Sequence, residues 1–205
     1  VGWIGQIYQS NFDARGVAIL IRKNIPFVYS SSISDPNGWY IIVAGTLNSK
    51  SITLVNLYGP NFEDPLFFQR VFKAIPNISD TSVIVGGDFI CTLDPLLDKR
   101  LSRSLQHSNS SVCLNTLMTN LNIVDIWRLT HPTDRDNSLF LSVHKSYSRI
   151  DQFFLLDSKL ISAAASVTYH PILVTDHSPL SMAQNPQQYV YRSATVALRR
   201  ILVER

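Results

Sequence analysis

The sequence has few cysteines, few charged residues and no long apolar run. Its 205 residues include two cysteines, Cys91 and Cys113, which form no CxxC motif and no Cys/His cluster with zinc spacing. This pattern argues against a zinc site and is typical of reduced core thiols in an intracellular protein. No apolar run approaches the roughly 20 residues needed to span a bilayer, so we expect no membrane segment.

Charge is also scarce. Charged residues make up 16% of the chain, and the net charge is +3. Such mild basicity permits a phosphate-binding role without requiring one, and non-specific affinity for DNA would have to come from local patches. The N-terminal residues Val1–Gln6 contain no initiator Met, no basic segment and no apolar segment, so we expect the sequence to begin within a domain.

The sequence does contain many short apolar runs separated by turn residues. Hydrophobic residues make up 45% of the chain, enough for one domain with a core. Apolar residues at helical spacing predict helices after Pro65 and over 108–121, and the short polar link 48–50 predicts a hairpin. The predicted strands are 14–21, 39–47, 51–58, 82–89, 123–127, 139–143, 150–156, 166–174 and 180–182.

Strands outnumber helices in this prediction, and short links between neighbouring strands favour antiparallel pairing. The pattern therefore indicates an α/β protein of the α+β type, with two mainly antiparallel sheets flanked by helices. A polar stretch at 184–188 changes the pattern, and four arginines lie beyond it. We predict one domain over 1–183 and a peripheral basic tail over 184–205, either an amphipathic helix or disordered.

Polar residues stand at the ends of several predicted strands, where proteins of this class place their sites. Tyr58 ends one strand and a Gly-Pro turn then presents Asn61, although this cluster taken alone fits a plain turn with a turn-favouring Asn better. Asp88 lies at the end of another strand beside two glycines, which let a ligand approach closely. The alternative for Asp88 is a solvated carboxylate in a turn.

Further clusters lie in the second half of the chain. Arg149 and Asp151 share one face of a strand, which fits either a site or an ion pair across that face. Asp176 and His177 lie between two strands, where they could form a metal ligand beside a general base, or a turn with an exposed histidine. Ser138 is a polar residue near the entry to a strand, which is a weak signal.

Phosphodiester cleavage is a chemistry that would use these groups together. It requires an activated water, a cation on the phosphate and donors for the developing charge. Asp88, Asp151 and Asp176 offer the carboxylate oxygens that Mg²⁺ prefers, and a second carboxylate can orient the imidazole of His177. The Tyr and Asn of the first cluster would then contact the phosphate.

The order of these motifs resembles the endonuclease/exonuclease/phosphatase superfamily. The motifs are Leu-Tyr-Gly-Pro-Asn, Gly-Gly-Asp-Phe, Ser-Arg-Ile-Asp and Thr-Asp-His-Ser-Pro-Leu, in that order along the chain. The residues at 14–21, 35–38, 125–128 and 144–151 resemble the apurinic-type endonuclease domain of LINE-type retrotransposons, and the similarity runs from about residue 1 to 182. The resemblance implies a four-layered sandwich whose first strand and helix are missing from this chain.

The resemblance also implies a role for each matching residue. His177 would be the catalytic histidine, Asp151 the carboxylate that orients it, and Asp88 a contact to the phosphate or to water. Tyr58 would line the phosphate site among the catalytic residues. Phosphate or DNA contacts are implied for Asn61, Ser138 and Arg149, and a metal contact for Asp176. The implied cofactor is Mg²⁺ or Mn²⁺, and the implied partner is DNA.

Two departures from the family pattern bear on activity. Ile90 stands where the family motif Gly-Asp-Phe-Asn has its Asn, and an Ile cannot donate a hydrogen bond to a phosphate oxygen. The loss of such a donor costs on the order of 10²–10³ in rate. The family's metal-binding Glu lies on an N-terminal element that we expect to precede residue 1, so the metal site of this chain would be incomplete.

Three functions remain open at this point. The first is a metal-dependent endonuclease that nicks DNA for target-primed retrotransposition, inside the cell and in the nucleus, beside a reverse transcriptase of the same polyprotein. The second is a catalytically dead relic, at most a weak nucleic-acid-binding module, which Ile90 favours. The third is a phosphatase, which would be supported by cleavage of a small phosphoester but not of DNA.

Overall fold

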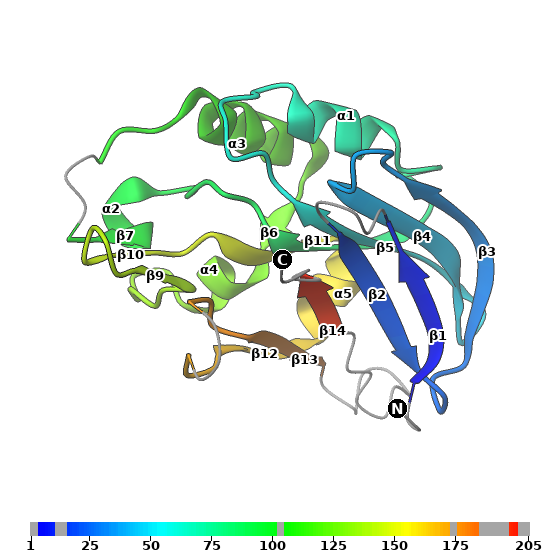
Figure 1. Cartoon of the computed structure of the whole chain (residues 1–205). Coiled ribbons are helices and arrows are strands. Elements are labelled where there is room, and N and C mark those ends of the chain that lie inside the picture. Colours follow the sequence, from blue (N-terminus) through cyan, green and yellow to red (C-terminus); the bar gives the residue numbers. More distant parts are fainter. Residues whose placement is uncertain (1–3, 11–15, 102–104, 173–175, 185–196, 201–205) are drawn as a thin grey trace.

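A six-stranded sheet forms the centre of the computed structural model, which describes residues 4–10, 16–101, 105–172, 176–184 and 197–200 (Figure 1). The strand order is β3-β4-β5-β6-β11-β8. Strands β5 and β6 are parallel, and the other neighbours are antiparallel. These strands are β3 Phe27–Ser34, β4 Tyr40–Leu47, β5 Lys50–Tyr58, β6 Ser82–Asp88, β8 Val124–Asp125 and β11 Asp151–Leu156.

One face of this sheet is covered by two helices, α1 (Phe67–Lys73) and α3 (Asn109–Leu121), which lie at the top of Figure 1. Alternate strand residues point to this face, so Leu57 and Val85 pack in one core with the helices. Helix α3 begins where the Ser108 side chain accepts a hydrogen bond from the backbone N–H of Ser111. It ends at Asn122, whose left-handed conformation closes the last turn.

The opposite face of the sheet is covered by a second layer of strands and short helices. Strand β2 (Val17–Arg22), helix α4 (Ile126–Thr130), helix α5 (Ser158–Ala163) and strand β12 (Ala164–Tyr169) all contribute to this core. Trp127 of α4 is 1% exposed and is among the largest buried side chains. The central sheet is therefore buried on both faces, which explains the nearly continuous apolar runs in β4, β5 and β6.

Three smaller sheets surround this core. They have the orders β1-β2-β14, β12-β13 and β7-β10-β9. The remaining elements are β1 Ile4–Gln9, α2 Pro95–Asp98, β7 Lys99–Arg100, β9 Leu139–Leu141, β10 Ser146–Ser148, β13 Leu180–Gln184 and β14 Ala197–Arg200.

The connection through α1 determines where the polar strand ends meet. Because β5 and β6 are parallel, their last residues, Tyr58 and Asp88, are register partners at one edge of the sheet. Strand β11 runs the other way, so its first residue, Asp151, pairs with Asp88. Three motifs that are far apart in the sequence therefore converge at this edge.

The predicted α+β class, with its sheet layers and flanking helices, is confirmed. The strand predicted at 123–127 is only partly right, because β8 ends at Asp125 and α4 begins at Ile126. The Asp125 side chain accepts a hydrogen bond from the backbone N–H of Arg128 and so caps α4. Strands β1 and β3 were not predicted, and the expectation that a strand and helix precede residue 1 stays a prediction.

The tail predicted over 184–205 includes a strand in its described part. Residues Ala197–Arg200 form β14, which pairs antiparallel with β2 in the register Ala197↔Leu20. A helix or a disordered segment was expected there. The domain boundary at 183 stays a prediction, and most of the tail lies outside the described residues.

Both cysteines are free thiols. Cys91 is buried in the core beneath α3, and burial raises the pKa of its thiol to about 12. The predicted reduced core thiol is therefore confirmed for Cys91, whereas Cys113 on α3 is half-buried. No helix in the described ranges is long and apolar enough to cross a membrane.

Candidate active site

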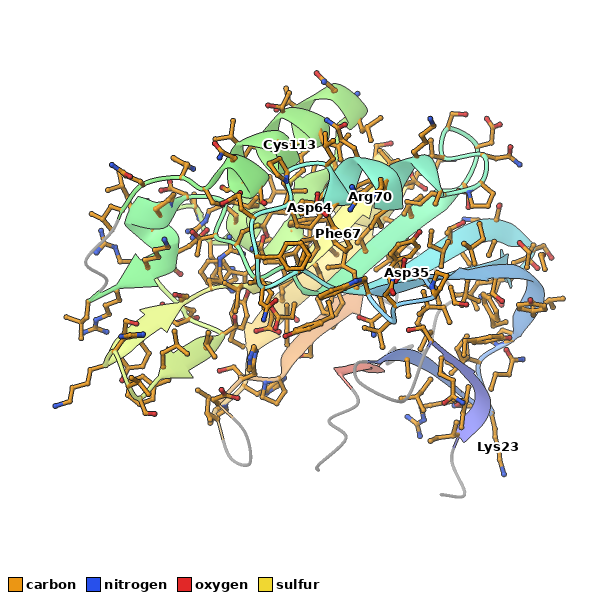
Figure 2. All side chains as sticks on the ribbon, turned by 45° about the horizontal axis from the view of Figure 1, so that its top comes forward. Lys23, Asp35, Asp64, Phe67, Arg70 and Cys113 are labelled. Atoms are coloured by element: carbon orange, nitrogen blue, oxygen red, sulfur yellow. The ribbon has the colours of Figure 1, made fainter. Side chains whose placement is uncertain are left out.

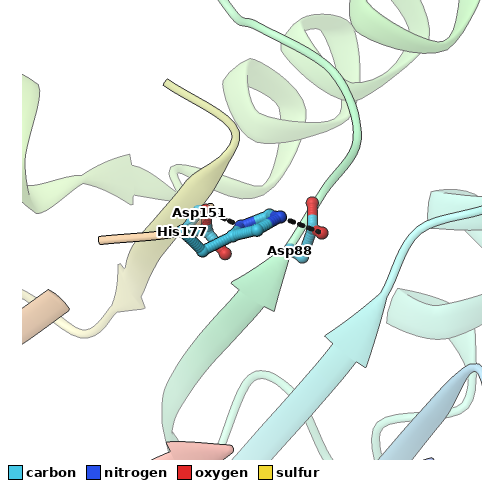
Figure 3. A group of neighbouring side chains, drawn as sticks. All are labelled: Asp88, Asp151 and His177. Atoms are coloured by element: carbon cyan, nitrogen blue, oxygen red, sulfur yellow. Dashed lines mark hydrogen bonds and ion pairs between the residues drawn. The ribbon is translucent and has the colours of Figure 1, made fainter. Parts of the chain in front are cut away.

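His177 lies between two carboxylates at the converging strand ends (Figure 3). Its Nδ1 is 2.8 Å from Asp151 Oδ2, so the ring N–H donates a hydrogen bond to that carboxylate. Its Nε2 is 3.9 Å from Asp88 Oδ2. The His177 side chain is 20% exposed, so the imidazole is partly accessible to solvent. An oriented imidazole beside a carboxylate is the arrangement of a general base.

The charge state of His177 is set by opposing effects. Burial acts to lower the pKa of the imidazole. The hydrogen bond to Asp151 and the negative charges of Asp151, Asp88 and Asp176 act in the opposite direction, and they prevail. The pKa of His177 is therefore raised above its ordinary value, which makes the ring a stronger base.

Ser138 fixes the strand that carries Asp151. Its hydroxyl accepts hydrogen bonds from the backbone N–H groups of Ile150, at 2.8 Å, and Asp151, at 2.9 Å. Its backbone carbonyl accepts from the N–H of Ser178, next to His177. Ser138 is 0% exposed, so the structure places it behind the site, where it holds both members of the His177–Asp151 pair in position.

The loop after β6 is closely packed against the loop after β5. Gly87 has a φ of 140°, and a Cβ there would lie 2.0 Å from the carbonyl oxygen of Leu57. The N–H of Gly59 donates to the carbonyl oxygen of Asp88 at 2.7 Å, and a Cβ at Gly59 would lie 2.5 Å from the carbonyl oxygen of Phe89. Both glycines are therefore needed for the close approach of the last residues of β5 and β6 and the loops that follow them.

Asp88 and Ile90 share a local hydrogen bond in this loop. Asp88 is 5% exposed, and its Oδ1 accepts from the backbone N–H of Ile90 at 3.0 Å. Ile90 has a φ of 54°, in the left-handed region that Asn tolerates and a β-branched residue does not. The backbone at position 90 thus has a conformation that suits an Asn better than the Ile that is present.

The other predicted residues are placed differently around the site. Tyr58 is half-buried at the end of β5, and Asn61 is exposed on the loop that follows. Asp176 is exposed, and its backbone carbonyl accepts from the N–H of Phe140. Tyr58 is thus next to Asp88 at the sheet edge, while Asp176 contributes its charge to His177.

Arg149 is directed away from this site into a buried ion network. It is 1% exposed, and its guanidinium binds Asp98 at 2.8 Å and Asp125 at 2.7 Å. Burial alone would lower the pKa of Arg149, but the two carboxylates raise it. Asp98, which is 0% exposed, also binds Arg128 at 2.6 Å. Arg149 therefore has a structural environment rather than an exposed face for phosphate.

Sequence reasoning did not identify Asp98 as a functional or structural group. It follows Leu97 at the end of the four-residue helix α2, and no periodicity marks it as buried. A charged residue is almost never fully buried unless it is paired. The pairing partners, Arg128 and Arg149, lie 30 and 51 residues away in the sequence, so only the fold reveals the network.

The described residues contain one group that could hold a metal ion. Ligand atoms of Asp88, Asp151 and His177 all lie within 4.8 Å of one another. Carboxylate oxygens fit the preference of a hard divalent cation, and one or two carboxylates with water suffice for Mg²⁺. Asp88 is the better candidate for such a contact, because Asp151 is already engaged by His177. Asp176, predicted as the metal contact, is not part of this group.

Comparison with solved structures identifies the class of fold. The chain superposes on the AP endonuclease LMAP from Leishmania major with a TM-score of 0.55 and 19% identity, over 72% of this chain and 55% of that one. The 3′ phosphatase NExo from Neisseria, solved with a product DNA hairpin, gives a TM-score of 0.63 and 17% identity, over 90% and 80%. The chain therefore shares its fold with an AP endonuclease and a 3′ phosphatase.

Two further comparisons relate the chain to retrotransposons. The endonuclease domain of TRAS1, a telomere-specific non-LTR retrotransposon, gives a TM-score of 0.58 at 13% identity, over 86% of this chain and 76% of that one. In sequence, the chain is 28% identical over 190 residues to the transposon TX1 uncharacterized 149 kDa protein of Xenopus laevis. No family model matches the chain. These findings confirm the predicted resemblance to a LINE-type retrotransposon endonuclease domain.

The sequence match covers a small part of the transposon protein. It includes 88% of this chain but only 14% of the 149 kDa protein. The chain thus spans about one seventh of the length of that relative.

Proposed function

We propose that the chain is a metal-dependent endonuclease domain that hydrolyses a phosphodiester bond of DNA. The observation that carries the proposal is the His177–Asp151 pair, with Asp88 facing Nε2 of the same imidazole. The nuclease folds and the transposon relative support DNA as the substrate. In the parent protein, this domain would act in the nucleus and supply a nick to a reverse transcriptase.

The geometry supports the following step for each group. His177 Nε2 takes a proton from water, while Asp151 holds Nδ1–H and stabilises the imidazolium that forms. The water oxygen forms a new bond to phosphorus as the bond to the leaving sugar oxygen breaks. Tyr58 and Asn61 would contact the phosphate from the neighbouring loop.

A divalent cation fits this chemistry, and we propose Mg²⁺ or Mn²⁺. When bound, such an ion would neutralise charge on the phosphate oxygens. The carboxylate of Asp88 would hold it, since Asp88 lies at the strand end and carries an oxygen facing His177.

The second candidate function is a nucleic-acid-binding module without catalytic activity. Ile90 favours it, because the family's Asn would donate a hydrogen bond that Ile cannot supply. The loss of one such donor reduces the rate by about 10²–10³ without abolishing binding. Both candidate functions therefore require the chain to bind nucleic acid, and only the first requires it to cleave the nucleic acid.

Nicking of supercoiled plasmid by the purified chain tests the proposal. We expect slow nicking with Mg²⁺ and none with EDTA. A folded protein that binds plasmid but does not nick it would support the non-catalytic module. Hydrolysis of p-nitrophenyl phosphate without nicking would instead support a phosphatase.

A further inference from the structure

Three aromatic side chains form a cluster beside the candidate site: Trp39, Tyr58 and Phe62. The rings of Trp39 and Tyr58 are stacked, with centroids 5.8 Å apart and planes 15° apart. Phe62 meets Trp39 edge to face, with centroids 6.1 Å apart and planes 80° apart. Edge-to-face and offset-stacked pairs are the favoured arrangements of aromatic rings.

The cluster is held in place from both sides. Asp35 Oδ2 accepts a hydrogen bond from the backbone N–H of Trp39 at 3.3 Å. The ring of Phe67 packs against the ring of Trp39, with the ring centroids 6.4 Å apart. Asp35 and Phe67 are both labelled in Figure 2. The backbone N–H of Tyr58 also donates to the carbonyl oxygen of Trp39 at 2.7 Å. A surface fixed in this way loses little conformational entropy when a ligand binds.

Phe62 is the outward member of the cluster. It is 59% exposed, whereas Trp39 and Tyr58 are half-buried. The acidic residues that follow it are engaged elsewhere, since Glu63 accepts hydrogen bonds from Ser110 and Asp64 binds Arg70. Neither carboxylate is therefore engaged with Phe62, and the exposed ring offers an apolar face to a ligand.

The cluster is continuous with the candidate site. Tyr58 is the register partner of Asp88, and Gly59 donates to the carbonyl oxygen of Asp88. Phe62 follows Gly59 by three residues, so their Cα atoms are separated by at most roughly 11 Å. This places Phe62 within reach of a nucleotide whose phosphate lies at the strand ends.

We propose that Phe62 stacks on a base of the DNA, next to the phosphate bound at Asp88 and His177. The inference rests on the proposed function and adds a nucleotide-contacting residue to it. A nucleobase fits because every base has a π-face, and stacking on an aromatic side chain tolerates any sequence. The exposed carboxamide of Asn61, adjacent in the chain, can donate to the same nucleotide.

Binding to DNA in EDTA tests this inference without requiring turnover. The probes are single-stranded and double-stranded oligonucleotides that contain 2-aminopurine, whose fluorescence is quenched by stacking. We expect Phe62→Ala to weaken binding about 5- to 150-fold and to lose the quenching, the loss expected for one base stack. Phe62→Tyr should retain both, because the ring is kept.

Tyr29→Ala is the matched control. Tyr29 is an exposed aromatic residue, 46% exposed, on the edge strand β3. We expect this variant to bind like the unmodified chain. Equal binding by Phe62→Ala, with nicking by the unmodified chain intact, would overturn the role of Phe62 and leave the proposed function standing. If the unmodified chain neither binds nor nicks DNA, both proposals fail.

Discussion

Ile90 has a backbone conformation that is unfavourable for a β-branched residue, and its side chain has no hydrogen-bond donor. Its φ of 54° is left-handed, and a left-handed conformation costs an L-residue roughly 1–2 kcal/mol. This free-energy cost is smaller for Asn, because its short polar side chain can form hydrogen bonds with the nearby backbone. Asp88 nevertheless holds the backbone N–H of Ile90, so the turn persists despite the substitution. The loop therefore has a geometry suited to a carboxamide.

The variant Ile90→Asn tests this reading of the loop. We expect it to raise the free energy of unfolding by about 1 kcal/mol, because it relieves the strained conformation. We also expect nicking to increase by about 10²–10³, because a donor to the phosphate is restored. Urea denaturation and plasmid nicking measure the two effects separately.

Ile90→Gly separates strain from chemistry. Glycine adopts positive φ freely but offers no side-chain donor. It should relieve the same strain without increasing nicking. If Gly and Asn increase nicking equally, the carboxamide is not the missing group.

The residues that carry the site were predictable because each stands in a short motif at a strand end. Asp88, Asp151 and His177 were all predicted as catalytic residues, and the structure brings them together. Ser138 and Arg149 were predicted as phosphate contacts, but both are buried and bonded within the protein. Their hydrogen-bond and ion-pair partners are distant in the sequence, and no local sequence pattern predicts such contacts.

At the scale of elements, the hairpin between β4 and β5 has a two-residue turn. Leu47 pairs with Lys50, and the turn residues Asn48 and Ser49 have φ values of 50° and 63°. Two positive φ values are characteristic of the tight turn whose twist matches that of the strands, and Asn-Gly is its favoured sequence. Ser49 is therefore the less suitable of the two residues.

Ser49→Gly should stabilise the protein by about 1 kcal/mol, because glycine adopts the left-handed conformation without a steric penalty. Chemical denaturation measures the change. Ser34→Gly, at the exposed end of β3, is a control that should not stabilise. A loss of stability in Ser49→Gly would contradict this description of the turn.

The buried network around Asp98 joins α2, α4 and the link between β10 and β11. Its carboxylate binds both Arg128 and Arg149, and the backbone N–H of Arg149 donates to the carbonyl of Asp98. Asp98→Ala would leave Arg149 buried with only part of its charge compensated. We expect a loss of about 3–5 kcal/mol in the free energy of unfolding.

The exposed pair Asp64–Arg70 provides the comparison. Asp64→Ala removes a solvent-accessible ion pair and should cost at most about 1 kcal/mol. Thermal or urea unfolding of both variants tests the difference. Equal losses would show that the Asp98 network contributes no more than a surface pair.

At the scale of the whole molecule, the class of fold could be predicted from the sequence, but the strands at the edges of the sheets could not. The central strands β4, β5 and β6 are marked by continuous apolar runs, because both faces of the sheet are covered. The edge strand β3 is exposed along most of its length and contains four serines, so its sequence does not predict a strand. Strand β14 likewise depends on pairing with β2, which is distant in the chain.

The candidate functional groups gather at one edge of the central sheet. The net charge of +3 is too small to determine a ligand, so the proposed binding of DNA would depend on the local surface. The converging strand ends and the aromatic cluster lie at the same edge of the sheet. One surface could thus hold the phosphate and an adjoining base together.

The most direct measurement is the rate of Mg²⁺-dependent plasmid nicking with and without the substitution His177→Ala. The substitution is made in two parents, the unmodified chain and the Ile90→Asn variant. His107→Ala, an exposed histidine outside the site, is the control. We predict that His177→Ala lowers the rate by about 10²–10⁴ in both backgrounds and that His107→Ala leaves it unchanged. Nicking by His177→Ala at the rate of its parent would contradict the assignment of the His177–Asp151–Asp88 group as the catalytic site.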